Sequence, residues 1–333
     1  MFGRSLTELE GLHWAELEHA YGSAADVPEM LRRLASSNEE ESGEAWEFLN
    51  SAILHQGDFY SATEAVLPFL IHLATTLPGQ RSRLLDYLAF LTRYDALQEG
   101  FQQNVAAFVH LVADETDADV QSNLAVILAG CVGHGDADRA LDRLLDAGVT
   151  PATRAIALLG LRARALPRCD AMIQQGRAAI ERMAAALVVY EQAPEWRRKA
   201  ELILIQLASD EQLHRQWEDQ LLGDLAEQLA EAFADAAAPA RMDLLRALRS
   251  ASSVLEHWML HLALGPPKTE TVALSDEQKE VVRDVARAVH GVGGITSQFA
   301  RDAFVEWGLP VDRHAIESLV GPLEPRKPWW RLW

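Results

Sequence analysis

AWEFLNSAILHQGDFYSATEAVLPFLIHLATTLPGQRSRLLDYLAFLTRY, residues 45–94, predicts a helix, a connecting turn and then a helix pair. Ser61 stands three residues before Glu64, the spacing of a capping box, so a helix is expected to begin there. The apolar residues that follow recur every three to four positions, which predicts one buried helical face. Pro68 lies inside this helix and predicts a kink. Residues 77–80 predict the turn and residues 83–94 the second helix of the pair.

The helix-turn-helix pattern recurs more loosely to about residue 250. Almost half of the residues are hydrophobic, and alternating β-branched runs are nearly absent, so we expect an all-α chain. The period of the repeat is roughly 40 residues, which is typical of HEAT and armadillo units. The second helices open on Arg83, Gln121, Arg154, Arg198 and Arg241.

The centre of the first helix, Leu67-Pro68-Phe69-Leu70, followed by a second helix opening on Arg83, resembles a HEAT repeat. Residues 14–28 and 55–63 are similar to a group of bacterial HEAT-like proteins, some of which look like immunity proteins encoded beside secreted toxins. The resemblance implies a right-handed α-solenoid of HEAT/armadillo-like helix pairs with helical caps. It also implies a protein that binds another protein.

We expect four segments along the chain. Residues 1–60 form an N-terminal helical cap or first repeat, 61–264 the HEAT-like repeats, 275–321 a C-terminal helical cap, and 322–333 a basic aromatic tail. Ser5 and Glu8 predict a first helix that ends near Gly22, and residues 36–42 are interpreted as a polar, acidic loop. The Trp-rich tail is expected to dock back onto the last helices.

Charge and composition narrow the function classes. A formal net charge of −19 disfavours binding of the whole molecule to phosphate backbones, although residues 151–200 are locally basic. The first residues carry no secretory signal and the apolar runs are too short to cross a bilayer, so a cytoplasmic protein without membrane contact is expected. Cys131 and Cys169 are expected to pack as small hydrophobic residues.

No enzyme motif is visible in the sequence. Gly-x-Ser-x-Gly, P-loop and dinucleotide fingerprints are missing, so we expect neither catalysis nor a cofactor. His257 and His261 share a helical face, but no third ligand is evident and no metal site is expected. For the cluster of His55, Asp58 and Tyr60, a structural role is favoured over acid-base chemistry.

The leading hypothesis is therefore a non-enzymatic α-solenoid that binds another protein, with a basic toxin domain as the particular partner. An acidic surface can occupy the cationic cleft of such a domain. The residues expected to bind the partner are acidic, aromatic or in the turn after residue 54: Glu40, Glu44, His55, Asp58, Tyr60, Tyr87 and Tyr94.

Two alternatives stay open. A HEAT-like nucleic-acid-binding protein or DNA glycosylase would use the Arg-rich centre, with Arg154, Arg162, Arg168 and Trp196 as its contacts. Against it, Arg154 occupies a repeat position that usually packs or pairs with acids of the adjacent repeat. The other alternative is a generic protein-interaction scaffold.

Overall fold

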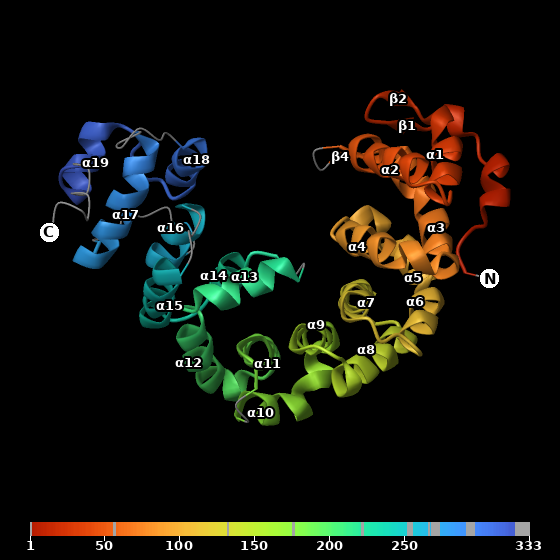
Figure 1. Ribbon diagram of the computed structural model, residues 1–333. Helices are drawn as coiled ribbons and strands as arrows, with labels where there is room; N and C mark the ends of the chain where they lie inside the picture. The colour runs from red at the N-terminus through yellow and green to blue at the C-terminus, as the bar shows by residue number, and fades with distance from the viewer. Residues whose placement is uncertain are drawn as a thin grey trace, which may run out of the picture. The chain divides into compact units, whose positions relative to one another are not determined.

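A computed structural model describes residues 2–55, 58–131, 133–174, 177–220, 223–251, 256–265, 267, 274–290 and 297–323 (Figure 1). Its described part contains nineteen α-helices, and its only strands form two hairpins of two-residue strands. The all-α class is thus confirmed. The chain divides into two compact units, Met1–Ala185 and Ala186–Trp333.

The first unit contains most of the helices. They are α1 (Val27–Leu34), α2 (Glu39–Phe48), α3 (Ser61–Thr76), α4 (Arg81–Leu91), α5 (Gln98–Gln103), α6 (Val105–Val112), α7 (Ala118–Gly130), α8 (Gly135–Ala147), α9 (Pro151–Leu161) and α10 (Leu166–Gln174). Helix α11 (Ala179–Gln192) runs through the division into the second unit. The second unit continues with α12 (Arg197–Leu207), α13 (Glu211–Asp219), α14 (Leu225–Ala232), α15 (Ala238–Ala251), α16 (Glu256–Leu264), α17 (Asp276–Val289), α18 (Gln298–Glu306) and α19 (Arg313–Val320).

The N-terminal segment differs from the expected single helix. Ser5 and Glu8 do form a capping box, but the 3-10 helix that they start ends at Gly11. After a second short 3-10 helix, Trp14–Glu16, the chain forms a hairpin of β1 (Glu18–His19) and β2 (Gly22–Ser23). Gly22 has φ +120°, a conformation that glycine adopts readily, so it turns the hairpin instead of ending a helix.

The helix pair predicted between residues 61 and 94 is present, but the N-cap of its first helix differs from the prediction. Tyr60, not Ser61, is the N-cap of α3, because the Tyr60 amide donates to Thr63 Oγ1 over 3.1 Å. The Ser61 hydroxyl instead accepts a 2.8 Å bond from the Glu18 amide, which ties the first hairpin to α3. Pro68 lies inside α3, and a 3-10 turn, Pro78–Gln80, joins α3 to α4, as expected.

Helix pairs of the first unit pack in two layers. Helices α3, α6 and α8 contact one another in sequence, and α4, α7 and α9 do the same, while α3 packs on α4, α6 on α7 and α8 on α9. Small residues allow close approach between neighbours, since a Cβ on Gly160 of α9 would lie 2.7 Å from Ala129 Cβ of α7. The predicted cap at Thr150 is confirmed, with its hydroxyl accepting a 3.0 Å bond from the Thr153 amide.

The second unit closes around its own core. Helices α16 to α19 pack together, with Phe304 and Ile316 fully buried, and the Trp307 indole donates to the Gly265 carbonyl over 2.8 Å. The predicted capping box of Ser275 and Gln278 starts α17. The expected turn at 291–294 and the tail from residue 324 onward lie outside the described residues.

Two further findings bear on the expectations from the sequence. Both cysteines are free and buried, as predicted for thiols packed as small hydrophobic groups. None of the helices in the described part of the chain combines the length and apolarity that crossing a bilayer demands.

Candidate functional site

The two hairpins of the first unit lie side by side. The second hairpin pairs β3 (Leu54–His55) with β4 (Asp58–Phe59), directly before α3. Its five preceding residues, Leu49–Ile53, form a π-helical turn that continues α2. The amide of Ala20, in the first hairpin, donates to the Ala52 carbonyl of this turn over 3.0 Å. Backbone bonds therefore fix the first hairpin to the π-helical turn that leads into the second.

An aromatic and acidic surface results, formed by Tyr21, His55, Asp58 and Tyr60, which we term the hairpin surface. The rings of Tyr21 and His55 meet edge to face with centroids 5.6 Å apart, and Tyr21 is 66% exposed. The pKa of Tyr60 is raised by desolvation first and then by the neighbouring charges of Asp58 and Tyr21. The Tyr60 hydroxyl consequently stays protonated at neutral pH and can donate a hydrogen bond.

The buried His19 side chain fixes the tip of the first hairpin, which carries Tyr21. Its buried ring accepts a 3.1 Å bond at Nδ1 from the Tyr21 amide, so the proton lies on Nε2, which is 3.0 Å from Asp26 Oδ1. The edge of the His19 ring also contacts Phe48 of α2 at a centroid distance of 5.4 Å. These contacts hold the hairpin tip, and with it the exposed Tyr21 side chain. Asp26 is the N-cap residue of α1, but its carboxylate makes no capping bond and faces His19.

The charge on the hairpin surface is not neutralised locally. Within the described part of the chain Asp58 forms no ion pair, and its side chain is exposed. His55 is held by a 3.0 Å contact between Nδ1 and the Ser51 carbonyl. The structure thus brings His55, Asp58 and Tyr60 of the expected partner-binding residues together and adds Tyr21, which the sequence interpretation placed at a helix end.

Glu40 and Glu44 lie elsewhere. The predicted acidic loop at 36–42 is wrong from residue 39 onward, because Asn38 caps α2 by accepting a 3.0 Å bond from the Glu40 amide. Acidic residues suit this first turn, since the helix dipole is positive there. Glu44 is paired with Arg33. Helix α2 has ten residues and is about 15 Å long, so it separates Glu40 from the hairpin surface.

Tyr87 is corrected from a surface anchor to a core residue. It is only 8% exposed, and its hydroxyl donates to the Leu49 carbonyl over 3.2 Å. Its ring also meets the edge of Trp46 of α2 at 6.0 Å. Burial holds its pKa well above the usual value for tyrosine. Tyr94 is half-buried and packs edge to face on Phe90, with centroids 6.2 Å apart.

Most of the Arg-rich centre pairs internally. Arg154 Nε donates to the buried Glu181 carboxylate over 2.7 Å, and Arg168 Nη1 donates to Asp142 over 2.6 Å. Arg162 is exposed and has φ +49° at the end of α9. Trp196 belongs to the second unit, is 51% exposed and has the Lys199 ammonium 5.3 Å from its ring. Two of the four expected nucleic-acid contacts are therefore committed to acidic partners.

No group of three His, Cys, Asp or Glu side chains suited to a metal ion occurs in the described ranges. The His257 side chain lies outside them, so the pair with His261 is not described. Comparison with protein-family models, curated proteins and solved structures finds no match to this chain. The class that the structure defines is an all-helical protein with two short hairpins in its first unit.

Proposed function

We propose that the chain is a non-enzymatic, protein-binding α-solenoid whose hairpin surface contacts the partner. In this proposal HEAT/armadillo-like helix pairs stack with a right-handed turn. The two layers of the first unit, α3, α6 and α8 beside α4, α7 and α9, support the stacking. The protein acts in the cytoplasm and transforms no substrate.

The observation that carries the proposal is the composition of the hairpin surface. Tyrosine is enriched in protein interfaces and at binding hot spots, since it adds large contact area and one hydrogen-bonding group. Tyr21 is 66% exposed although its amide donates to His19 Nδ1 and the amide of the neighbouring Ala20 donates to the Ala52 carbonyl, so little conformational entropy is lost on binding. The unpaired Asp58 favours a partner with a basic surface.

The resemblance stated for the sequence makes the proposal more specific. Residues 14–28 and 55–63, which carry the likeness to bacterial HEAT-like proteins, contain all four residues of the hairpin surface. We therefore extend the proposal to an immunity protein that neutralises a cognate secreted toxin. Its mechanism is steric cover of a basic toxin domain, assisted by electrostatic attraction.

The test begins with a search for a gene beside this one that encodes a large secreted protein, which is the candidate toxin. Its toxic domain is co-expressed with the wild-type chain or with Tyr21→Ala or Asp58→Lys, and growth and the dissociation constant of the purified complex are measured. Each variant is expected to weaken binding by about tenfold or more, the range of an interface hot spot. Binding through Asp58 should also weaken with added salt, because exposed charges are screened within about 8 Å at physiological ionic strength.

Glu231→Lys in α14 is the matched control, since it makes the same charge change at an exposed residue of the second unit. It is expected to bind and protect like the wild type. Protection that survives both hairpin variants would exclude the hairpin surface as the binding site. Absence of protection by the wild type, together with several weak partners of unrelated character, would favour the generic scaffold.

A further inference from the structure

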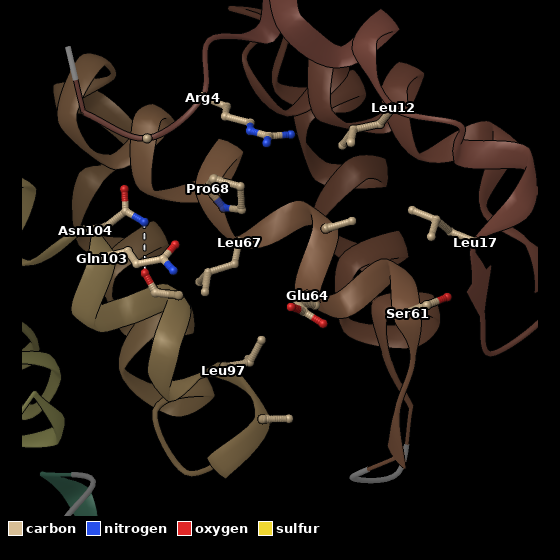
Figure 2. Close-up of a pocket in the computed structure, with 14 residues that line it drawn as sticks. Arg4, Leu12, Leu17, Ser61, Glu64, Leu67, Pro68, Leu97, Gln103 and Asn104 are labelled. Atoms are coloured by element: carbon tan, nitrogen blue, oxygen red, sulfur yellow. Dashed lines mark hydrogen bonds between the residues drawn. The ribbon is translucent and has the colours of Figure 1, made fainter.

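A cavity of about 600 Å³ lies between the N-terminal segment, α3 and α5 (Figure 2). Its size is that of sites that hold small organic ligands. The wall on α3 is formed by residues one helical turn apart, Ser61, Glu64, Ala65 and Pro68. Opposite them α5 approaches closely, since a Cβ on Gly100 would lie 2.6 Å from Leu67 Cδ2.

The N-terminal segment is anchored over this cavity by its backbone. The Arg4 amide donates to the Pro68 carbonyl over 3.0 Å, and the Phe2 carbonyl lies 3.1 Å from His72 Nδ1. Between them Gly3 has φ +67°, and a Cβ there would lie 2.3 Å from the Pro68 oxygen, so only glycine fits. These contacts fix the Arg4 backbone, and its exposed side chain lines the cavity.

Apolar and polar groups face the same space. Asn104 donates its side-chain amide to the Gly100 carbonyl over 2.9 Å, which fixes the amide and leaves its oxygen as an acceptor. Pro68 has no amide hydrogen, so the Glu64 carbonyl lacks its α-helical donor. The apolar part of the lining consists mainly of Leu12, Leu17, Leu67 and Leu97.

Arg4 and Glu64 are the charged groups of this cavity, and they come from different elements (Figure 2). Within the described residues neither forms an ion pair with the other or with a third group, although most arginines of the first unit are paired. Two opposite charges that face one cavity without meeting can be bridged by a ligand that carries both charges. An extended dipeptide separates its terminal ammonium and carboxylate by about 7 Å.

We propose that this cavity binds short zwitterionic peptides with aliphatic side chains. The peptide carboxylate meets the Arg4 guanidinium, and its ammonium meets the Glu64 carboxylate. The central amide faces the Asn104 oxygen, while the aliphatic side chains contact the leucines. This activity is independent of the hairpin surface and of any protein partner.

The probe is the dipeptide Leu-Leu, and binding to the full chain is measured by isothermal titration calorimetry. Two blocked forms are matched probes: N-acetyl-Leu-Leu lacks the ammonium and Leu-Leu amide lacks the carboxylate. Each is expected to bind about tenfold to a hundredfold more weakly than Leu-Leu, because it loses one charge-assisted contact. The variants Glu64→Gln and Arg4→Gln should each remove the discrimination against the corresponding blocked form.

Glu16→Gln is the control, since Glu16 is exposed and does not line the cavity. Its discrimination among the three peptides should equal that of the wild type, and thermal melts of all three variants should coincide because the replaced side chains are exposed. The proposal is overturned if Leu-Leu gives no heat at millimolar concentration. It is also overturned if the blocked peptides bind as well as Leu-Leu, or if discrimination persists in both cavity variants.

Discussion

The ion pair between Arg154 of α9 and Glu181 of α11 gives a stability prediction that also bears on the nucleic-acid hypothesis. The Glu181 side chain is only 2% exposed, and Arg154 Nε lies 2.7 Å from its Oε1. Arg154 Nη1 donates in addition to the Gly148 carbonyl over 2.5 Å. The guanidinium thus joins the turn before α9 to the start of α11, so its removal should lower the free energy of unfolding.

Arg154→Leu leaves the buried Glu181 carboxylate with Arg177, whose Nη1 is 3.8 Å away. Removal of one partner from a buried ion pair costs about 3–5 kcal/mol. Since Arg177 remains and the Arg154 side chain is 20% exposed, we expect a smaller loss, about 2–3 kcal/mol. For a unit of this size the melting temperature falls by roughly 4–12 °C. Glu181→Leu removes the buried charge itself and should lower the free energy of unfolding by less than Arg154→Leu does.

Thermal melts followed by circular dichroism of the wild type, both single variants and the double variant measure these differences. The double variant is expected to be more stable than Arg154→Leu, because no buried carboxylate is left unpaired. A melt of Arg154→Leu that coincides with the wild type would refute the reasoning. If that variant melted normally and also lost retention on immobilised DNA, Arg154 would be a nucleic-acid contact instead of a structural one.

Two further predictions concern buried polar groups. Tyr87→Phe removes the bond to the Leu49 carbonyl and should lower the free energy of unfolding by about 1 kcal/mol in urea titrations, without changing partner affinity. Burial raises the pKa of the Cys131 and Cys169 thiols to about 11, so iodoacetamide at pH 8 should label them only after unfolding. Because the thiols of the unfolded chain ionise at lower pH than the buried ones, their contribution to the free energy of unfolding is complete below pH 9 and is lost as pH rises through 11. Urea titrations across this range should show a smaller fall in the free energy of unfolding for C131A/C169A than for the wild type.

Features with a local physical cause could be predicted from the sequence. The capping box at Ser275, the proline-started helix after Thr150 and the turn at residues 78–80 each depend on a few neighbouring residues, and each is present. Helix α3 begins at Ser61 as expected, but its N-cap is Tyr60, one residue earlier than predicted, because two hydroxyls compete there. Thr63 bonds to the Tyr60 amide, while Ser61 is taken by the distant Glu18 amide.

The first hairpin could not be predicted, and with it the place of Tyr21 in the hairpin surface. Strands of two residues are too short to show an alternating pattern, and residues 5–22 carry helix-like spacing of apolar side chains. Long-range hydrogen bonds favour the hairpin over a helix here, since the Ala20 amide bonds to the Ala52 carbonyl and the Glu18 amide to the Ser61 hydroxyl. The signal in the sequence is Tyr21-Gly22, an aromatic residue beside a glycine, and the same pair also suits the end of a helix.

Tyr87 shows a second limit of sequence patterns. Leu84, Leu88 and Leu91 already supply an apolar face of α4, so the flanking Tyr87 was expected to reach the solvent. In the structure α4 packs against α3 and α7, and its Tyr87 contacts the end of α2. A helix with neighbours on several sides buries a wider arc than one amphipathic stripe, so residues beside the stripe become core.

Charge on this chain is informative only after internal pairing is taken into account. The acidic run around residue 40 is the most conspicuous in the sequence, yet Glu44 is neutralised by Arg33, and the helix dipole of α2 compensates the acidic residues of its first turn. Asp58 forms no ion pair among the described residues, and it lies beside the half-buried Tyr60. A basic partner gains more from an uncompensated charge within an aromatic surface, where desolvation strengthens the interaction, than from a solvated helix end. For this reason Asp58→Lys is expected to weaken the complex more than Glu40→Lys, although both reverse one exposed acidic charge; equal losses would assign attraction to net charge alone.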